Sequence, residues 1–123
     1  MEMLTARDAA AQLGPLFTAD GRETVAVLFL NDAHQRLALE SWPGEAETIA
    51  LPLRAILQRA LALDAAGLVI AHDHPSGDPQ PSRADILATR LLADTAEAVG
   101  IRLHDHLIFA GARCRSLRAL GLL

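Results

Sequence analysis

The sequence has no lysine, no tyrosine and only one cysteine among its 123 residues. All eleven basic side chains are therefore arginine, and fifteen acidic residues outnumber them, which gives a formal net charge of −4. Nucleic-acid binding needs clustered cations that neutralise phosphates, and only Arg113, Arg115 and Arg118 crowd together along the sequence. We therefore expect no strong nucleic-acid binding.

Leader-like and membrane-spanning segments are also missing. The start of the chain, from Met1 to Gly14, contains no long apolar run, so we expect no signal peptide. No stretch approaches the roughly 20 apolar residues that span a membrane. The single cysteine, Cys114, excludes an internal disulfide and a zinc site built from several cysteines. These absences predict a soluble, cytoplasmic protein with no membrane partner.

Aromatic side chains are scarce, at three phenylalanines and one tryptophan, although 51% of the residues are hydrophobic. The core must therefore be built mainly from leucine, isoleucine, valine and alanine. The length suits one compact domain, so we expect a single domain over residues 1–123.

Apolar periodicity predicts strands that alternate with helices after an initial hairpin. The expected helices are 6–13, a segment from Pro52 that ends at Gly67, and 82–99, with a helical turn at 117–120. The expected strands are 23–31, 36–40, 68–71, 101–110 and 113–116, with a loop at 41–46 and a short additional strand at 48–51. This order predicts an α/β fold in which helices pack on a mixed sheet.

Two histidines stand where a buried strand ends. The apolar run LVIA leads directly into His72-Asp73-His74, and residues two apart in extended backbone project to the same face. Imidazole is a good zinc ligand, and a catalytic zinc ion usually takes three protein ligands and one water. An isolated H-x-H pattern is weak evidence for a metal, so the prediction depends on a third ligand nearby.

Asp85 is the natural third ligand. Prolines at 75, 79 and 81 stiffen the intervening loop, and Ser82 then begins a helix whose first turn contains Asp85. Side chains in a first turn lean back toward the helix N-terminus, and therefore toward the histidines. The same two residues also fit a capping box, and an aspartate near a helix N-terminus is stabilised by the helix dipole alone. The sequence is therefore compatible with Asp85 as a metal ligand and with Asp85 as a capping residue.

The segment HDHPSGDPQPSRAD, residues 72–85, resembles the H-x-H-x7-S-x2-D signature of JAMM (JAB/MPN) metalloproteases, and its HPSG and PS elements are similar to RadC-like domains. The similarity extends over ETVAVLFLND, PLRAILQRALALDAAGLVIAHDHPSG and GIRLHDHLIFAG, and so covers nearly all of the chain from Glu23 onward. It implies a JAB/MPN-like, cytidine-deaminase-like layered fold with a mixed central sheet flanked by helices.

The resemblance also implies roles. His72, His74 and Asp85 match the zinc ligands, Ser82 matches the serine that steadies the oxyanion or the metal-bound water, and Glu23 matches the general base. Without the family, Glu23 would be read as a solvated residue at the end of a strand. The implied reaction is hydrolysis by a metal-activated water, with a peptide or a ubiquitin-like protein conjugate as possible substrate.

The sequence departs from the family at Asp73, where RadC-like domains usually have asparagine. An acid there could hydrogen-bond nearby backbone. A second H-D-H segment, 104–106, is more typical of a structural role, although Asp105 or His106 could orient the zinc histidines. Asp105 is also the next candidate for the general base. Cys114 is expected to be a packed small apolar residue.

Two other functions stay open. One is a DNA-repair-associated factor acting on or near DNA, which the acidic charge and the lack of helix-hairpin-helix segments disfavour. The other is a non-catalytic MPN scaffold, although such scaffolds have usually lost the ligands. A cytidine deaminase is disfavoured because the H-x-E and P-C-x-x-C elements are missing.

Overall fold

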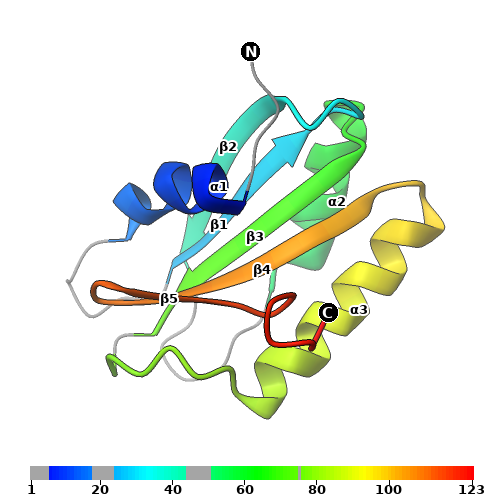
Figure 1. Ribbon diagram of the computed structural model, residues 1–123. Coiled ribbons are helices and arrows are strands. Elements are labelled where there is room, and N and C mark those ends of the chain that lie inside the picture. The colour runs from blue at the N-terminus through cyan, green and yellow to red at the C-terminus, as the bar shows by residue number, and fades with distance from the viewer. Residues whose placement is uncertain (1–5, 18–23, 44–50, 75) are drawn as a thin grey trace.

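The computed structural model describes residues 6–17, 24–43, 51–74 and 76–123, and its centre is one five-stranded sheet with the strand order β2-β1-β3-β4-β5 (Figure 1). The strands are β1 (Thr24–Leu30), β2 (Arg36–Pro43), β3 (Gly67–Asp73), β4 (Arg102–Ala110) and β5 (Arg113–Ser116). The helices are α1 (Ala6–Leu13), α2 (Leu53–Ala62) and α3 (Arg83–Ala98), and a 3-10 turn, Gly14–Leu16, follows α1. Strands β3 and β4 are parallel and are connected through α3, whereas the other neighbouring strands are antiparallel. The predicted mixed α/β, JAB/MPN-like fold is confirmed.

Helices cover both faces of the sheet. Alternate residues of β1, namely Val25, Val27 and Phe29, belong to the core that includes residues of α2 and α3. The residues between them pack in a second, smaller core with α1, on the opposite face. Figure 1 shows α1 on one side of the strands and α2 and α3 on the other. Because both faces are covered, β1 reads as a continuous apolar run and not as an alternating pattern.

The expected boundaries of β2, β3 and α2 are wrong. Strand β2 continues to Pro43, so Ser41–Pro43 is not part of a loop; Trp42 pairs with Val25 and packs on the larger core. Strand β3 begins at Gly67, which was expected to end the preceding helix. Pro52 is the N-cap of α2 and not its first helical residue. Residues 48–50 of the expected additional strand lie outside the described residues, and Leu51 is in no strand.

Strand β4 contains one extra residue relative to β3. Leu68 pairs with Leu103 and Val69 pairs with Asp105, so His104 forms a β-bulge. A bulge shifts the alternation of side chains by one residue. Leu103 belongs to the core on the α2 and α3 side, and after the bulge His106 faces that same side. Asp105 faces the α1 side together with its partner Val69.

No helix in the described ranges is both long and apolar enough to cross a membrane.

Gly67 leaves room for the ring of His104. A Cβ atom built at position 67 would overlap Nε2 and Cδ2 of that ring. The ring of His104 also packs against His34, with ring centroids 4.6 Å apart. The glycine is therefore required by a close approach and not by its backbone angles.

We expect Gly67→Ala to destabilise the fold by about 1–3 kcal/mol, because an extra methyl group must displace a packed ring. The free energy of unfolding from urea denaturation measures this cost. In a His104→Ala background the same change should be neutral or slightly stabilising, since alanine then replaces a flexible glycine in a strand without a clash. Equal costs in the two backgrounds would show that the ring contact is not the cause.

Candidate metal centre

Three side chains meet at the carboxyl end of β3. His72 is the penultimate residue of that strand, His74 follows the strand, and Asp85 is in the first turn of α3. The Nε2 atoms of the two histidines are 2.9 Å apart, Nε2 of His74 is 3.2 Å from Oδ2 of Asp85, and Nε2 of His72 is 3.7 Å from Oδ1. This group could hold a metal ion. The arrangement follows from the fold, because the crossover helix begins where the parallel strand ends.

Two of the three side chains in the centre are buried, and the third is partly exposed. The side chains of His72 and Asp85 are 1% and 0% exposed, whereas that of His74 is 14% exposed. Solvent and small molecules can therefore approach the group from the side of His74. Gly77 and Asp78, which follow His74 in the sequence, are also exposed.

The proton position on His74 is fixed by the loop. Its Nδ1 atom is 2.8 Å from the carbonyl oxygen of Asp78, and a carbonyl can only accept a hydrogen bond. Nδ1 is therefore the donor, and the lone pair of Nε2 points into the centre. The backbone N–H of His74 donates to the carbonyl of Phe109 at 2.8 Å, which fixes this residue against β4.

A hydrogen-bonded chain fixes His72 in the same way. The Thr89 hydroxyl donates to the backbone carbonyl of Asp85 at 2.6 Å, so its oxygen accepts from Nδ1 of His106 at 2.5 Å. Nε2 of His106 is then an acceptor, and it receives the Nδ1 proton of His72 at 2.6 Å. The lone pair on Nε2 of His72 is consequently directed at Asp85 and His74. Outer hydrogen bonds of this kind orient metal-binding histidines.

The result is a cluster of acceptors with no donor between them. Two imidazole lone pairs and the carboxylate of Asp85 converge, and Oδ1 of Asp85 is buried with no hydrogen-bond partner among the described residues. An unsatisfied buried carboxylate oxygen is costly, and a cation placed among the three groups would remove that cost. The donor set therefore fits a metal ion.

Burial favours the neutral forms of His72 and His106. Desolvation lowers the pKa of His72 to about 4, against the opposing effect of the Asp85 carboxylate and with a further lowering by His74. Desolvation also lowers the pKa of His106 well below its usual value, and the neighbouring His72 and His74 add to that effect. Neutral imidazole is the form that binds metals.

Asp85 belongs to the candidate metal-binding group and also completes the capping box that the sequence left open. Ser82 caps α3 by accepting the N–H of Asp85 at 3.0 Å, and Oδ2 of Asp85 accepts the N–H of Ser82 at 2.8 Å. This capping box orients the carboxylate so that its other oxygen, Oδ1, faces His72. Ser82 itself is exposed at the edge of the centre. Its oxygen accepts from Asp85, so its hydroxyl proton remains available to donate.

Asp73 points away from the centre, to the other face of the sheet. Its Oδ1 accepts the backbone N–H of Thr24 at 2.8 Å, as expected of an acid that hydrogen-bonds nearby backbone. This bond attaches the start of β1 to the end of β3, beside the pairing of Val25 with His72. Glu23, the predicted general base, immediately precedes Thr24 in the sequence and lies outside the described residues.

The second H-D-H segment divides into three separate roles. His106 orients His72, whereas Asp105 binds the C-terminal turn through Ser116 and the backbone N–H of Arg118. Asp105 faces the opposite side of the sheet from His72, so its interpretation as an alternative base or as a partner of the zinc histidines is wrong. The bulge at His104 is the physical reason, and simple alternation in the sequence could not reveal it.

Cys114 is exposed on β5, so the expectation that it is packed in the interior is wrong. Partial burial and the nearby Asp105 raise the pKa of its thiol, which disfavours the thiolate form. This is the opposite of what a nucleophilic cysteine requires.

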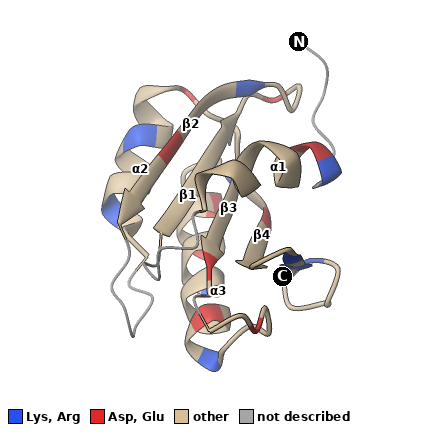
Figure 2. Cartoon of the chain, turned by 90° about the vertical axis from the view of Figure 1, so that its left-hand side faces the viewer, with Lys and Arg blue, Asp and Glu red and all other residues tan. Residues whose placement is uncertain are grey.

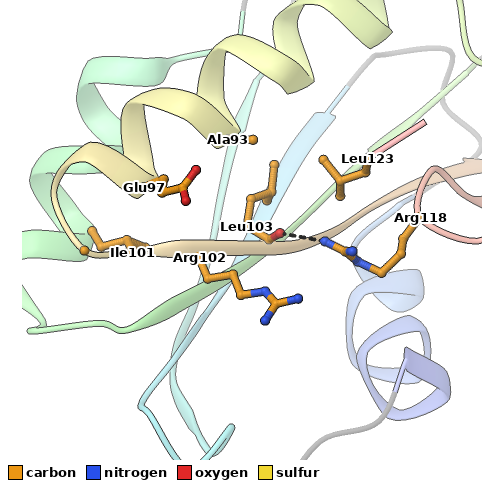
Figure 3. Close-up of a pocket in the computed structure, with 8 residues that line it drawn as sticks. Ala93, Glu97, Ile101, Arg102, Leu103, Arg118 and Leu123 are labelled. Carbon is orange, nitrogen blue, oxygen red and sulfur yellow. Dashed lines mark hydrogen bonds between the residues drawn. The ribbon is translucent and has the colours of Figure 1, made fainter. Parts of the chain in front are cut away.

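A separate hollow of about 470 Å³ lies at the other end of α3 and β4 (Figure 3). Ala93, Glu97 and Leu103 line it, with Leu123 across from them, and the guanidinium of Arg118 donates to the carbonyl of Leu103 at its margin. None of the residues of the metal-binding group lines this hollow.

The fold and the site together define a JAB-type domain, in which a mixed sheet and its crossover helix bring two histidines and an aspartate together. The family model described as "RadC-like JAB domain" matches residues 3–122, and the chain belongs to this family. The chain is 44% identical over 102 residues to a UPF0758 protein of Rhodobacter capsulatus, covering 82% of this chain and 48% of the relative. It is 37% identical over 125 residues to a UPF0758 protein of Salinibacter ruber, covering 100% of this chain and 53% of the relative. The chain thus spans about half the length of the curated relatives it matches.

We expect purified protein to bind about one divalent metal ion per chain, with His72→Ala and Asp85→Ala each weakening the affinity by more than about 100-fold. Each substitution removes one of the three converging donors. Isothermal titration after chelator treatment measures both the stoichiometry and the affinity.

The matched control for the metal titration is His34→Ala, which removes a histidine at the far end of the sheet and should leave affinity unchanged. Thr89→Val removes only the outer hydrogen bonds and should weaken binding by about 10- to 100-fold. Full metal retention in both His72→Ala and Asp85→Ala would exclude this group as the site.

The lowered pKa values predict that the metal-free protein loses stability in weak acid. Because the folded pKa of His72 is about 4 and the usual value is 6.5, the unfolded chain binds more protons between these pH values. Stability from this residue is therefore present above about pH 6.5 and is lost as the pH falls toward 4, by up to about 3 kcal/mol.

Urea denaturation at several pH values between 7 and 4, with chelator present, tests the predicted acid sensitivity. The pH slope of the unfolding free energy should be smaller in His72→Ala/His106→Ala than in the wild type, whatever the absolute stability of the variant. Identical slopes would contradict the assignment of neutral, buried histidines.

Proposed function

We propose that this protein is a zinc-dependent hydrolase of the JAMM type that cleaves a peptide or isopeptide bond. The observation that carries the proposal is the convergence of two imidazole lone pairs and one carboxylate in a centre where His72 and Asp85 are buried and His74 is partly exposed. Three protein donors with one accessible direction are typical of catalytic zinc sites, whereas structural sites are closed by four ligands.

The donor chemistry supports zinc over magnesium or calcium. Two imidazoles dominate the set, and imidazole suits zinc and related transition metals, whereas magnesium and calcium prefer oxygen donors. When bound, zinc lowers the pKa of a water molecule toward about 7 and polarises the carbonyl that is attacked. His72, His74 and Asp85 would hold the ion.

The remaining steps are assigned to side chains of this chain. Glu23 is proposed to take the proton of the attacking water and to deliver it to the leaving amine. Ser82 is proposed to donate a hydrogen bond where negative charge develops on the scissile carbonyl oxygen. Its exposed position at the margin of the centre and its available hydroxyl proton support this role. His106 and Thr89 keep His72 in the correct tautomer.

The proposed substrate is a peptide or a ubiquitin-like protein conjugate, approaching from the side of His74. A direct role on DNA receives less support. Figure 2 shows the basic segments in that view separated along α1, α2, β2 and α3 and beside the C-terminus, without a continuous basic stripe. Together with the net charge of −4, this leads us to propose that tight duplex DNA binding is not part of its function.

Glu23→Gln should retain metal and fold but lower hydrolytic turnover by about 10²- to 10⁴-fold, since an amide can contact the water but cannot accept its proton. A panel of peptides and ubiquitin-like conjugates first identifies a substrate. Turnover and metal content are then measured on the same preparations.

Glu97→Gln, at the other end of α3, is the matched control for the turnover measurement and should behave like the wild type. Turnover of Glu23→Gln within about threefold of the wild type would reject Glu23 as the base. Hydrolysis that persists in metal-free protein would reject the proposed function as a whole.

A further inference from the structure

The outward face of α3 carries an apolar row. Leu87 and Leu91 are 57% and 55% exposed, and Val99, just past the end of the helix, is 48% exposed. Leu87 and Leu91 are four positions apart, so they lie along one side of the helix, whereas Val99 caps its C-terminal end. The opposite side of α3 is already buried in the domain core through Leu92 and its neighbours. An exposed row of this kind indicates contact with another surface.

Charged side chains run beside this apolar row. Arg83 and Arg90 are in the N-terminal half of α3, Asp94 and Glu97 are in the C-terminal half, and all four are exposed. At 3.6 residues per turn they fall within a sector of about 60°. Among the described residues no ion pair joins any of them. Arg90 precedes Asp94 by four residues, which is the less favourable order for a pair within one helix.

We propose that α3 is a self-association surface that packs antiparallel against α3 of a second copy of this chain. A two-fold axis perpendicular to the helices brings the same flank of each copy together. The basic half of one charged flank then faces the acidic half of the other. Arg90 would lie near Asp94 of the second copy, and Arg83 near Glu97.

Both charge pairs fit the same register. The midpoint between Arg90 and Asp94 is position 92, and that between Arg83 and Glu97 is position 90. The two midpoints differ by about 3 Å along the helix, which long side chains can span. Leu91 lies between them, so the leucine rows of the two copies meet at the axis. A parallel pair would instead place the charged flank against the apolar one.

The interface consists of one helix from each copy and is therefore small. Interfaces of this size are expected to be weak and reversible. Antiparallel packing also separates the two metal-binding groups, since Asp85 is near the N-terminus of each α3 and faces its own core. Each centre then keeps its open side, and no residue of one copy is needed to complete the centre of the other.

Sedimentation velocity on the full chain between about 10 μM and about 1 mM tests the association. The weight-average mass should rise from 13.1 kDa toward about twice that value. Leu87→Glu/Leu91→Glu should abolish the rise, and Leu61→Glu, a matched control on α2 with 57% exposure, should not. A wild type that stays monomeric throughout would overturn the proposal.

Charge exchange tests the antiparallel orientation. Arg83→Glu/Arg90→Glu and Asp94→Arg/Glu97→Arg should each be monomeric alone, because like charges then face each other. An equimolar mixture should regain the doubled mass, with circular dichroism establishing that both variants are folded. Failure of two folded variants to associate when mixed would overturn the proposed register.

Discussion

The hydrogen bond between His72 and His106 is the contact on which the site depends. It joins the parallel strands β3 and β4 through side chains, and His106 in turn holds Thr89 of the crossover helix. The same threonine hydroxyl bonds the backbone carbonyl of Asp85, so all three elements are connected through one chain. Each group in this series of hydrogen bonds donates to the next one toward the carbonyl of Asp85. The proton of His72 is therefore on Nδ1, and its Nε2 atom is free toward the centre. Position and chemical state are therefore set by the same bonds.

This arrangement depends on irregularities in otherwise regular elements. The bulge at His104 turns His106 toward α3 and Asp105 away from it. The additional residue in β4 therefore places His106, and not Asp105, next to His72. Gly67, at the start of β3, makes space for the displaced His104 ring. Bulges next to functional sites commonly re-aim a side chain in this way. The bulge at His104 and the space left by Gly67 thus allow His106 to contact His72 near the end of β3.

Stability and function make opposing demands on Asp85. Its Oδ2 atom completes the capping box of α3, which stabilises the helix, whereas its Oδ1 atom is left buried without a partner among the described residues. Without a cation, the buried Oδ1 atom lowers the stability of the domain, and a bound cation would remove this effect. The outward face of α3 presents a comparable conflict, since Leu87 and Leu91 leave more than half of their surface exposed in one copy. The two proposals, a metal ion at Asp85 and a second copy along α3, would each relieve one of these conflicts.

The sequence by itself determined the fold class, most helix and strand boundaries, and the proximity of His72, His74 and Asp85, because apolar periodicity and a short, proline-stiffened connection are local properties. It also indicated the capping box, since Ser82 and Asp85 are only three residues apart. Glu23 came from family resemblance alone, as nothing local distinguishes it from the other glutamates. Only the tertiary structure decided the roles of Thr89, His106 and Asp105. Those roles depend on the register between β3 and β4, and register is set by packing between segments that are distant in the sequence.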